Sequence, residues 1–260
     1  MLYNYHTHTK RCNHAVGEDR EYVENAIKAG IKTLGFSDHA PYYFTDTEYR
    51  SSFRMADDEI NEYADSVRAL KKEYAKDIDI LLGFELEYYP RYHVEEMKFL
   101  NTVSPDYFIL GQHFIGNETY NKQHTYYTEL DVVQEYVSQT IQGLKTGDFT
   151  YMAHPDLVYP FSCETAKLKK EFTRLCEFAK KAGVPLELNL LGVREGRHYP
   201  SQTFFEIAGK VGCDIVVGFD AHDPVSFFDK NSLDKANAII EKYNLNVLKN
   251  PFIKVKGKNV

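Results

Sequence analysis

Histidines and carboxylates in this 260-residue sequence recur at or just beyond the points where short apolar runs end. Side chains two positions apart in a strand point to the same face, so His6 and His8 can hold one ion, and Asp220 with His222 can face the same cavity. Imidazole and carboxylate ligands suit zinc, iron or manganese better than magnesium or calcium. The run-end residues are His6, His8, His39, Glu85, Glu87, His113, His154, Asp220 and His222.

Each of these residues has a commoner, non-functional interpretation when taken alone. A His-x-His pair arises often by chance, His154 precedes a proline as packed or capping histidines do, and Glu85 could be a strand-end charge in solvent. However, the same chemistry occurs at six strand ends, which independent decoration would almost never produce. The pattern therefore predicts a metal centre.

The elements that position these residues alternate along the chain. Short apolar runs, typical of buried strands, occupy residues 2–5, 33–36, 78–82, 107–110, 149–152, 185–188 and 214–217. Helix-like amphipathic stretches lie at residues 19–29, 57–75, 129–144, 164–182, 201–211 and 233–243. This alternation predicts an α/β fold with a parallel sheet closed into a barrel, whose site lies at the carboxyl ends of its strands. We expect one domain over residues 1–260, with the aromatic-rich stretch 40–54 as a loop over the barrel mouth.

Composition limits the classes of function. The net charge of −7 argues against nucleic acid as a partner. Four cysteines without paired spacing indicate neither a zinc ribbon nor a disulfide framework. No apolar stretch has the length of a signal peptide core or a membrane span, so we expect a cytoplasmic protein with reduced thiols and no membrane contact. The oligomeric state is left open.

The motifs H-T-H-T, D-H, G-x-E, H, H-P and D-x-H, in this order from His6 to His222, resemble the polymerase and histidinol phosphatase (PHP) family. The resemblance implies a distorted (β/α)7 TIM-like barrel and two to three divalent ions of zinc, iron or manganese. It implies a first site of His6, His8, Glu85 and Asp220, a second of Glu85 (bridging), His113 and His154, and a third of His14, His39 and His222. The attacking group would be hydroxide generated on the ions; a general acid is not identified.

Within that family, H-T-H-T-x-x-C-x-H-A, D-H-A-P and the segment 189–200 most resemble the monofunctional histidinol-phosphate phosphatases. This implies a small phosphorylated substrate, L-histidinol phosphate, and a place in histidine biosynthesis. The segment is expected to form a loop that begins at Asn189 and brings Arg197 or Arg194 to the phosphate, Arg197 being favoured, with His198 assisting. The alternative is that one arginine pairs with Glu195 on the surface.

Four further residues carry open or negative expectations. Asp38 either orients an imidazole of the centre or is a solvated loop carboxylate. Cys12 could be a soft ligand, but burial as a small apolar residue is favoured. His93 and His124 are expected not to be ligands.

Two rival functions remain. A PHP phosphoesterase could act on another small phosphate ester or on nucleic acid, which would require a basic, aromatic-lined track. A non-catalytic metal-binding module would have closed sites ligated fully by protein. The shared Glu85 and the three-residue sites instead predict open coordination.

Overall fold

The computed structural model describes residues 2–42, 44, 46–119, 123–124, 130–158 and 165–249. By its internal contacts the chain divides into two compact units. The first consists of Met1–Leu86, Pro90–Ile109 and Gly218–Asp229, and the second of Glu87–Tyr89, Leu110–Val217 and Lys230–Val260. The single domain expected over residues 1–260 stays a prediction.

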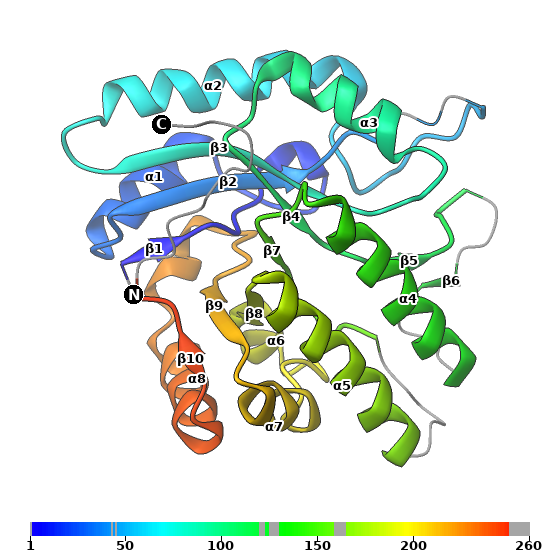
Figure 1. The fold of residues 1–260 in the computed structure, drawn as a ribbon. Helices are drawn as coiled ribbons and strands as arrows, with labels where there is room; N and C mark the ends of the chain where they lie inside the picture. The colour runs from blue at the N-terminus through cyan, green and yellow to red at the C-terminus, as the bar shows by residue number, and fades with distance from the viewer. Residues whose placement is uncertain are drawn as a thin grey trace. The chain divides into compact units, whose positions relative to one another are not determined.

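The first unit is built on strands β1 (Tyr3–Asn4), β2 (Thr33–His39), β3 (Asp79–Leu86) and β4 (Tyr107–Leu110), adjacent in that order (Figure 1). The pairs β1–β2 and β2–β3 are parallel. The side chain of Tyr107 crosses these strands, and its hydroxyl donates to the carbonyls of Tyr5 at 2.8 Å and Phe36 at 3.0 Å. A Cβ at Gly35 or Gly83 would lie 2.2 Å or 2.4 Å from the Tyr107 side chain, so these strands need glycine where the ring crosses.

Helices α1 (Asp19–Lys28), α2 (Ile60–Glu73) and α3 (His93–Leu100) belong to the same unit, together with the 3-10 turns η1 (Lys10–Cys12) and η4 (Pro224–Phe228). Helix α2 runs alongside β3 (Figure 1). Its buried residues recur at helical spacing and are Ile60, Tyr63, Ala64, Val67 and Leu70. This apolar stripe, rather than helix propensity, fixes the helix against the strand.

In the second unit β7 (Tyr151–Met152), β8 (Leu186–Asn189), β9 (Asp214–Gly218) and β10 (Asn246–Val247) are adjacent in that order, with β7–β8 and β9–β10 parallel. The helices are α4 (Leu130–Thr146), α5 (Thr165–Ala182), α6 (Leu190–Glu195), α7 (Gln202–Val211) and α8 (Lys230–Tyr243). Helix α5 packs against α4 and α7 (Figure 1). A short antiparallel hairpin joins β5 (Phe114–Ile115) to β6 (Gln123–His124).

All seven expected strands and all six expected helices are present, with ends shifted by a few residues. The structure adds β10, the hairpin and the short helices α3 and α6. The loop expected from Asn189 is wrong over its first part, because Asn189 is the N-cap of α6 and its side chain accepts a hydrogen bond from the backbone N–H of Gly192. Among the residues described, no helix is both long and apolar enough to cross a membrane.

Candidate metal centre

The first unit brings together the chain segments that follow β1 and β9. The backbone N–H of His8 donates to the carbonyl of Ala221 at 2.9 Å, and the N–H of Ala221 donates to the carbonyl of His6 at 3.1 Å. The bridge places Asp220, which has a left-handed backbone at φ 48°, next to both histidines. Residues more than 200 positions apart in the sequence thus meet because two strand ends pair.

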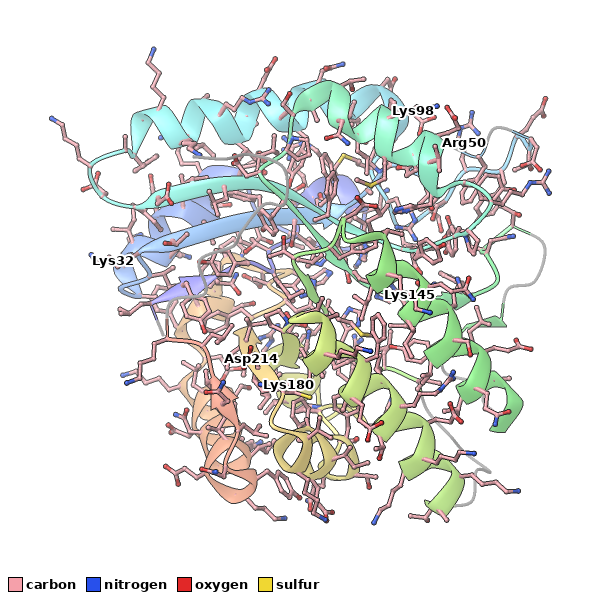
Figure 2. All side chains as sticks on the ribbon, in the orientation of Figure 1. Lys32, Arg50, Lys98, Lys145, Lys180 and Asp214 are labelled. Carbon is pink, nitrogen blue, oxygen red and sulfur yellow. The ribbon has the colours of Figure 1, made fainter. Side chains whose placement is uncertain are left out.

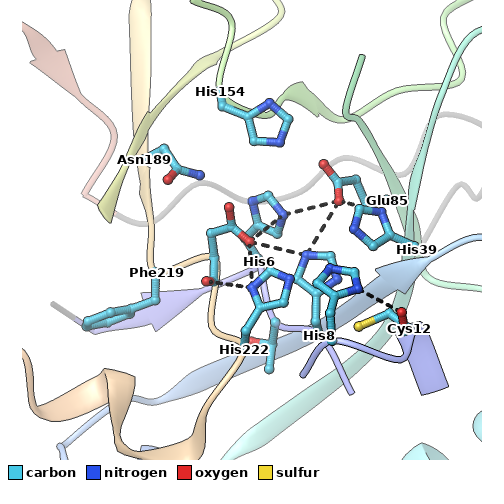
Figure 3. Close-up of polar contacts among 12 residues, drawn as sticks. His6, His8, Cys12, His39, Glu85, His154, Asn189, Phe219 and His222 are labelled. Atoms are coloured by element: carbon cyan, nitrogen blue, oxygen red, sulfur yellow. Dashed lines mark hydrogen bonds and ion pairs between the residues drawn. The ribbon is translucent and has the colours of Figure 1, made fainter. Parts of the chain in front are cut away.

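Two carboxylates approach the same two imidazoles (Figure 3). Asp220 Oδ1 lies 3.4 Å from His6 Nε2 and 3.2 Å from His8 Nε2. Glu85 Oε2 lies 3.6 Å and 3.4 Å from the same two nitrogens. All four residues are buried. Two ligand atoms held about 2.1 Å from one ion in tetrahedral geometry lie about 3.4 Å apart, so these spacings suit a shared metal ion. The predicted first site is therefore assembled.

His14, His39 and His222 also converge, as predicted for the third site. Their ligand atoms lie within 4.8 Å of one another, and His14 is the exposed member. His39 Nδ1 lies 3.0 Å from Glu85 Oε2, so the same carboxylate oxygen faces both groups of the first unit (Figure 3). Buried His and carboxylate clusters of this kind fit a centre with more than one metal ion.

The charges in the cluster act on one another. Burial disfavours ionisation of Asp220, yet the imidazoles of His6, His8 and His222 hold its pKa well below the usual range. Burial and the neighbouring His8 hold the pKa of His222 well below its ordinary value. A neutral imidazole and an ionised carboxylate are the forms in which these side chains bind metals.

Asp38 orients two residues of the centre. Its carboxylate is fully buried, with Oδ1 3.3 Å from His8 Nδ1. The same oxygen accepts a hydrogen bond from the backbone N–H of His39 at 2.8 Å, and Oδ2 accepts one from the Thr9 hydroxyl. Hydrogen bonding at Nδ1 leaves the Nε2 of His8 directed at the cluster. The alternative of a solvated loop carboxylate is wrong.

Cys12 is fully buried, as expected. Its sulfur nonetheless forms a third compact group with ligand atoms of His8 and His222. Burial and proximity to the histidines therefore hold together for this thiol. His93 is in none of the described ligand groups, as predicted, and the side chain of His124 lies outside the described residues.

The second unit holds His113 and His154 through buried glutamates. Glu87 Oε1 lies 2.9 Å from His113 Nδ1, and its Oε2 accepts a hydrogen bond from the backbone N–H of His113 at 2.9 Å. Glu187 Oε2 accepts hydrogen bonds from the backbone N–H of His154 and from Asn189 Nδ2, both at 2.9 Å. The two imidazole centroids are 4.8 Å apart. Because Glu85 belongs to the other unit, its role as a bridging ligand to this pair stays a prediction.

Sequence reasoning missed the orienting role of both glutamates. Glu87 was placed among the strand-end residues without a role, and Glu187 was not singled out. Strand alternation could have found Glu187, because it lies two residues before Asn189 on the same strand face.

The proposed phosphate-binding residues lie after β8. Arg197 Nε donates to Glu195 Oε2 at 2.7 Å and Nη1 donates to the Tyr199 hydroxyl at 2.8 Å, with 36% of the side chain exposed. This is the surface pair considered as the alternative for this arginine. His198 Nε2 lies 2.7 Å from the carbonyl of Leu157, and burial lowers the pKa of His198. Arg194 is half-buried on α6. Phosphate binding by any of them stays a prediction.

Known proteins resemble this chain over most of its length. A protein of Deinococcus radiodurans named "Probable histidinol-phosphatase" is 29% identical, over 84% of this chain and 85% of its own. The histidinol-phosphatase of Bacillus subtilis is 34% identical, over 44% of each chain. A histidinol phosphate phosphatase of Lactococcus lactis, solved with zinc, L-histidinol and phosphate, superposes with a TM-score of 0.74 at 22% identity and covers 95% of each chain.

The structural match confirms the predicted fold class, an α/β fold of parallel strands and helices of the TIM-like PHP type. The PHP domain model matches residues 4–190, which contain His6, His8, His14, His39, Glu85, His113 and His154. Since that match spans more than half of the sequence, the chain belongs to the PHP domain family.

Proposed function

We propose that this metal-dependent PHP phosphoesterase is a histidinol-phosphatase that hydrolyses L-histidinol phosphate to L-histidinol and phosphate. The observation that carries the phosphoesterase part is the buried convergence of His6, His8, Glu85 and Asp220. The substrate rests on the names of the relatives and on the Lactococcus lactis protein, whose structure contains L-histidinol and phosphate. The reaction would serve histidine biosynthesis in the cytoplasm.

The proposed centre holds two to three divalent ions of zinc, iron or manganese. The candidate ligands are His6, His8, His14, His39, Glu85, His113, His154, Asp220 and His222. Such ions lower the pKa of a coordinated water and stabilise the charge that develops on phosphoryl oxygens. The protein contributes carboxylates that balance the ionic charge, and the partners Asp38 and Glu87 that fix two imidazole orientations.

Arg197, Arg194 and His198 are proposed to contact the substrate. Arg197 would have to exchange its ion pair with Glu195 for the phosphate. That pair is partly exposed, and exposed pairs are worth only about 0–1 kcal/mol, so the exchange costs little. A guanidinium grips two phosphate oxygens at once, which favours arginine at such a position.

The decisive experiment is steady-state kinetics on L-histidinol phosphate beside a panel of small phosphomonoesters and single-stranded DNA. We expect kcat/KM to be highest for L-histidinol phosphate and abolished by chelation. Equal rates across the panel would leave a phosphoesterase of broad or different specificity. Release of nucleotides from DNA with no phosphomonoesterase activity would refute the proposal in favour of a nuclease.

The charges of the described residues give a nuclease no support. Lys32, Arg50 and Lys98 lie at separate places on the outside of the first unit (Figure 2). Lys98 pairs with Glu95 at 2.7 Å, and Lys10 pairs with Glu18 at 2.6 Å. Strand-binding grooves instead line up cations along one track. A non-catalytic module would bind metal and cleave none of the esters in the panel.

A further inference from the structure

A buried arginine lies in the irregular segment between β2 and α2 of the first unit. Only 2% of Arg54 is exposed, although arginine is almost never fully buried without a specific interaction. Burying a guanidinium costs free energy because it loses its hydration. A position for this residue in the interior therefore calls for a role that needs its charge.

Two separate contacts place Arg54 beside the predicted third metal site. Asn13, which precedes His14, donates from Nδ2 to the carbonyl of Arg54 at 3.1 Å. On the other side, the Phe53 ring stands edge-on to the imidazole of His39, with centroids 5.9 Å apart. The segment is thus held between two of the three histidines of that group.

Aromatic rings define the orientation of the guanidinium. Its central carbon lies 4.8 Å from the Phe53 ring centroid and 5.7 Å from the Tyr42 ring centroid. A guanidinium stacked on ring faces keeps its N–H donors in its own plane, so stacking is compatible with a simultaneous bidentate contact to an anion. Flexibility is reduced by the same rings, which lowers the entropy cost of binding.

Other arginines of the unit spend their donors on carboxylates. Arg11 contacts Asp19 at 2.9 Å and Glu62 at 2.7 Å, and Arg20 contacts Glu73. Their charges are committed to structural ion pairs. Arg54 differs in having its charge placed against rings next to the metal-binding histidines.

We propose that Arg54 binds the phosphate group of the substrate beside the His14, His39 and His222 group. The inference rests on the proposed phosphomonoesterase function and adds a cation from the same unit as that group. Arg54 is thereby a substrate-binding residue in addition to those after β8, and the aromatic segment before α2 becomes part of the substrate site.

The test compares Arg54→Met, which keeps much of the length and apolar bulk, with Arg54→Lys and the control Arg50→Met. Arg50 is exposed in the same segment and donates to the carbonyl of Tyr49. Each variant is assayed for KM on L-histidinol phosphate, for inhibition by inorganic phosphate and by L-histidinol, and for metal content.

We expect Arg54→Met to raise KM and the phosphate inhibition constant roughly 10- to 100-fold, the range for a charge-assisted contact. The inhibition constant for L-histidinol and the metal content should stay at the wild-type values, because neither involves the phosphate. Arg54→Lys should recover part of the loss, and Arg50→Met should behave as wild type.

An unchanged phosphate inhibition constant in Arg54→Met, with wild-type activity established, overturns the inference. So does a parallel loss of phosphate binding, L-histidinol binding and metal, which marks a purely structural role. If the wild-type protein hydrolyses no phosphomonoester, the proposed function fails. Calorimetric titration of the zinc-loaded protein with inorganic phosphate then decides separately whether Arg54 binds the anion.

Discussion

Replacing Glu85 by glutamine removes one negative charge from the centre with almost no change in shape. Its Oε2 lies 3.0 Å from His39 Nδ1, 3.4 Å from His8 Nε2 and 3.6 Å from His6 Nε2. One oxygen therefore faces ring nitrogens of two predicted metal sites. The glutamine side chain fits the same space but brings a neutral amide to both.

The size of the effect follows from the burial of this carboxylate, which is 1% exposed. A unit charge about 4 Å from an opposite charge, at an effective dielectric constant of about 20, is worth about 4 kcal/mol. Since about 1.4 kcal/mol corresponds to a factor of ten, the loss amounts to about three orders of magnitude, and the amide dipole recovers part of it. We expect kcat to fall by about 10²- to 10³-fold, with a lower metal content.

The assay is kcat on a phosphomonoester together with elemental analysis, and Glu87→Gln is the matched comparison. Glu87 is equally buried but contacts His113 rather than facing a shared site. Loss of an orienting partner typically costs about 10- to 100-fold, so Glu87→Gln should be the milder change. If Glu87→Gln is the more damaging of the two, the assignment of Glu85 as the shared carboxylate is wrong.

Three further predictions concern metal, phosphate and pH. Protein prepared without chelator should carry two to three equivalents of zinc, iron or manganese by elemental analysis; one equivalent or less with full activity would contradict the multinuclear centre. Arg197→Ala should raise KM and lower kcat/KM by about 2–4 kcal/mol at unchanged metal content, with Arg197→Lys recovering part and Arg194→Ala run in parallel; unchanged kinetics in both alanine variants would remove this segment from the phosphate site. Burial raises the pKa of Asp156 from 3.8 to about 7; the unfolding free energy of the metal-free protein should therefore fall by up to about 4 kcal/mol as pH rises from about 4 to above 7. Denaturant titrations should show a flatter pH profile for Asp156→Asn, and identical profiles would exclude a neutral Asp156.

Local patterns in the sequence were enough to predict most of the elements. The apolar run at 107–110 became β4 with the same bounds, and the amphipathic stretch at 164–182 became α5. Both signals are periodic and long enough to outweigh local preferences. The short helix α6 escaped because its capping residue, Asn189, was interpreted as the start of a loop.

The first and third metal groups were also predictable, because each member has a chemistry that strand ends rarely carry by chance. Asp220 and His6 meet as predicted. Ordered motifs along the chain predicted which residues gather, since parallel strands deliver their carboxyl ends to one edge of a sheet.

The sequence by itself determined the metal chemistry of this protein, the family and the succession of strands and helices, because these depend on residue type and spacing. Only the tertiary structure decided that Asp38 orients His8 and that Arg54 is buried beside Phe53. It likewise showed Arg197 paired with Glu195. Such contacts depend on side-chain direction and on the path of irregular segments, which have no periodic signal in the sequence and are set by the packing of distant residues.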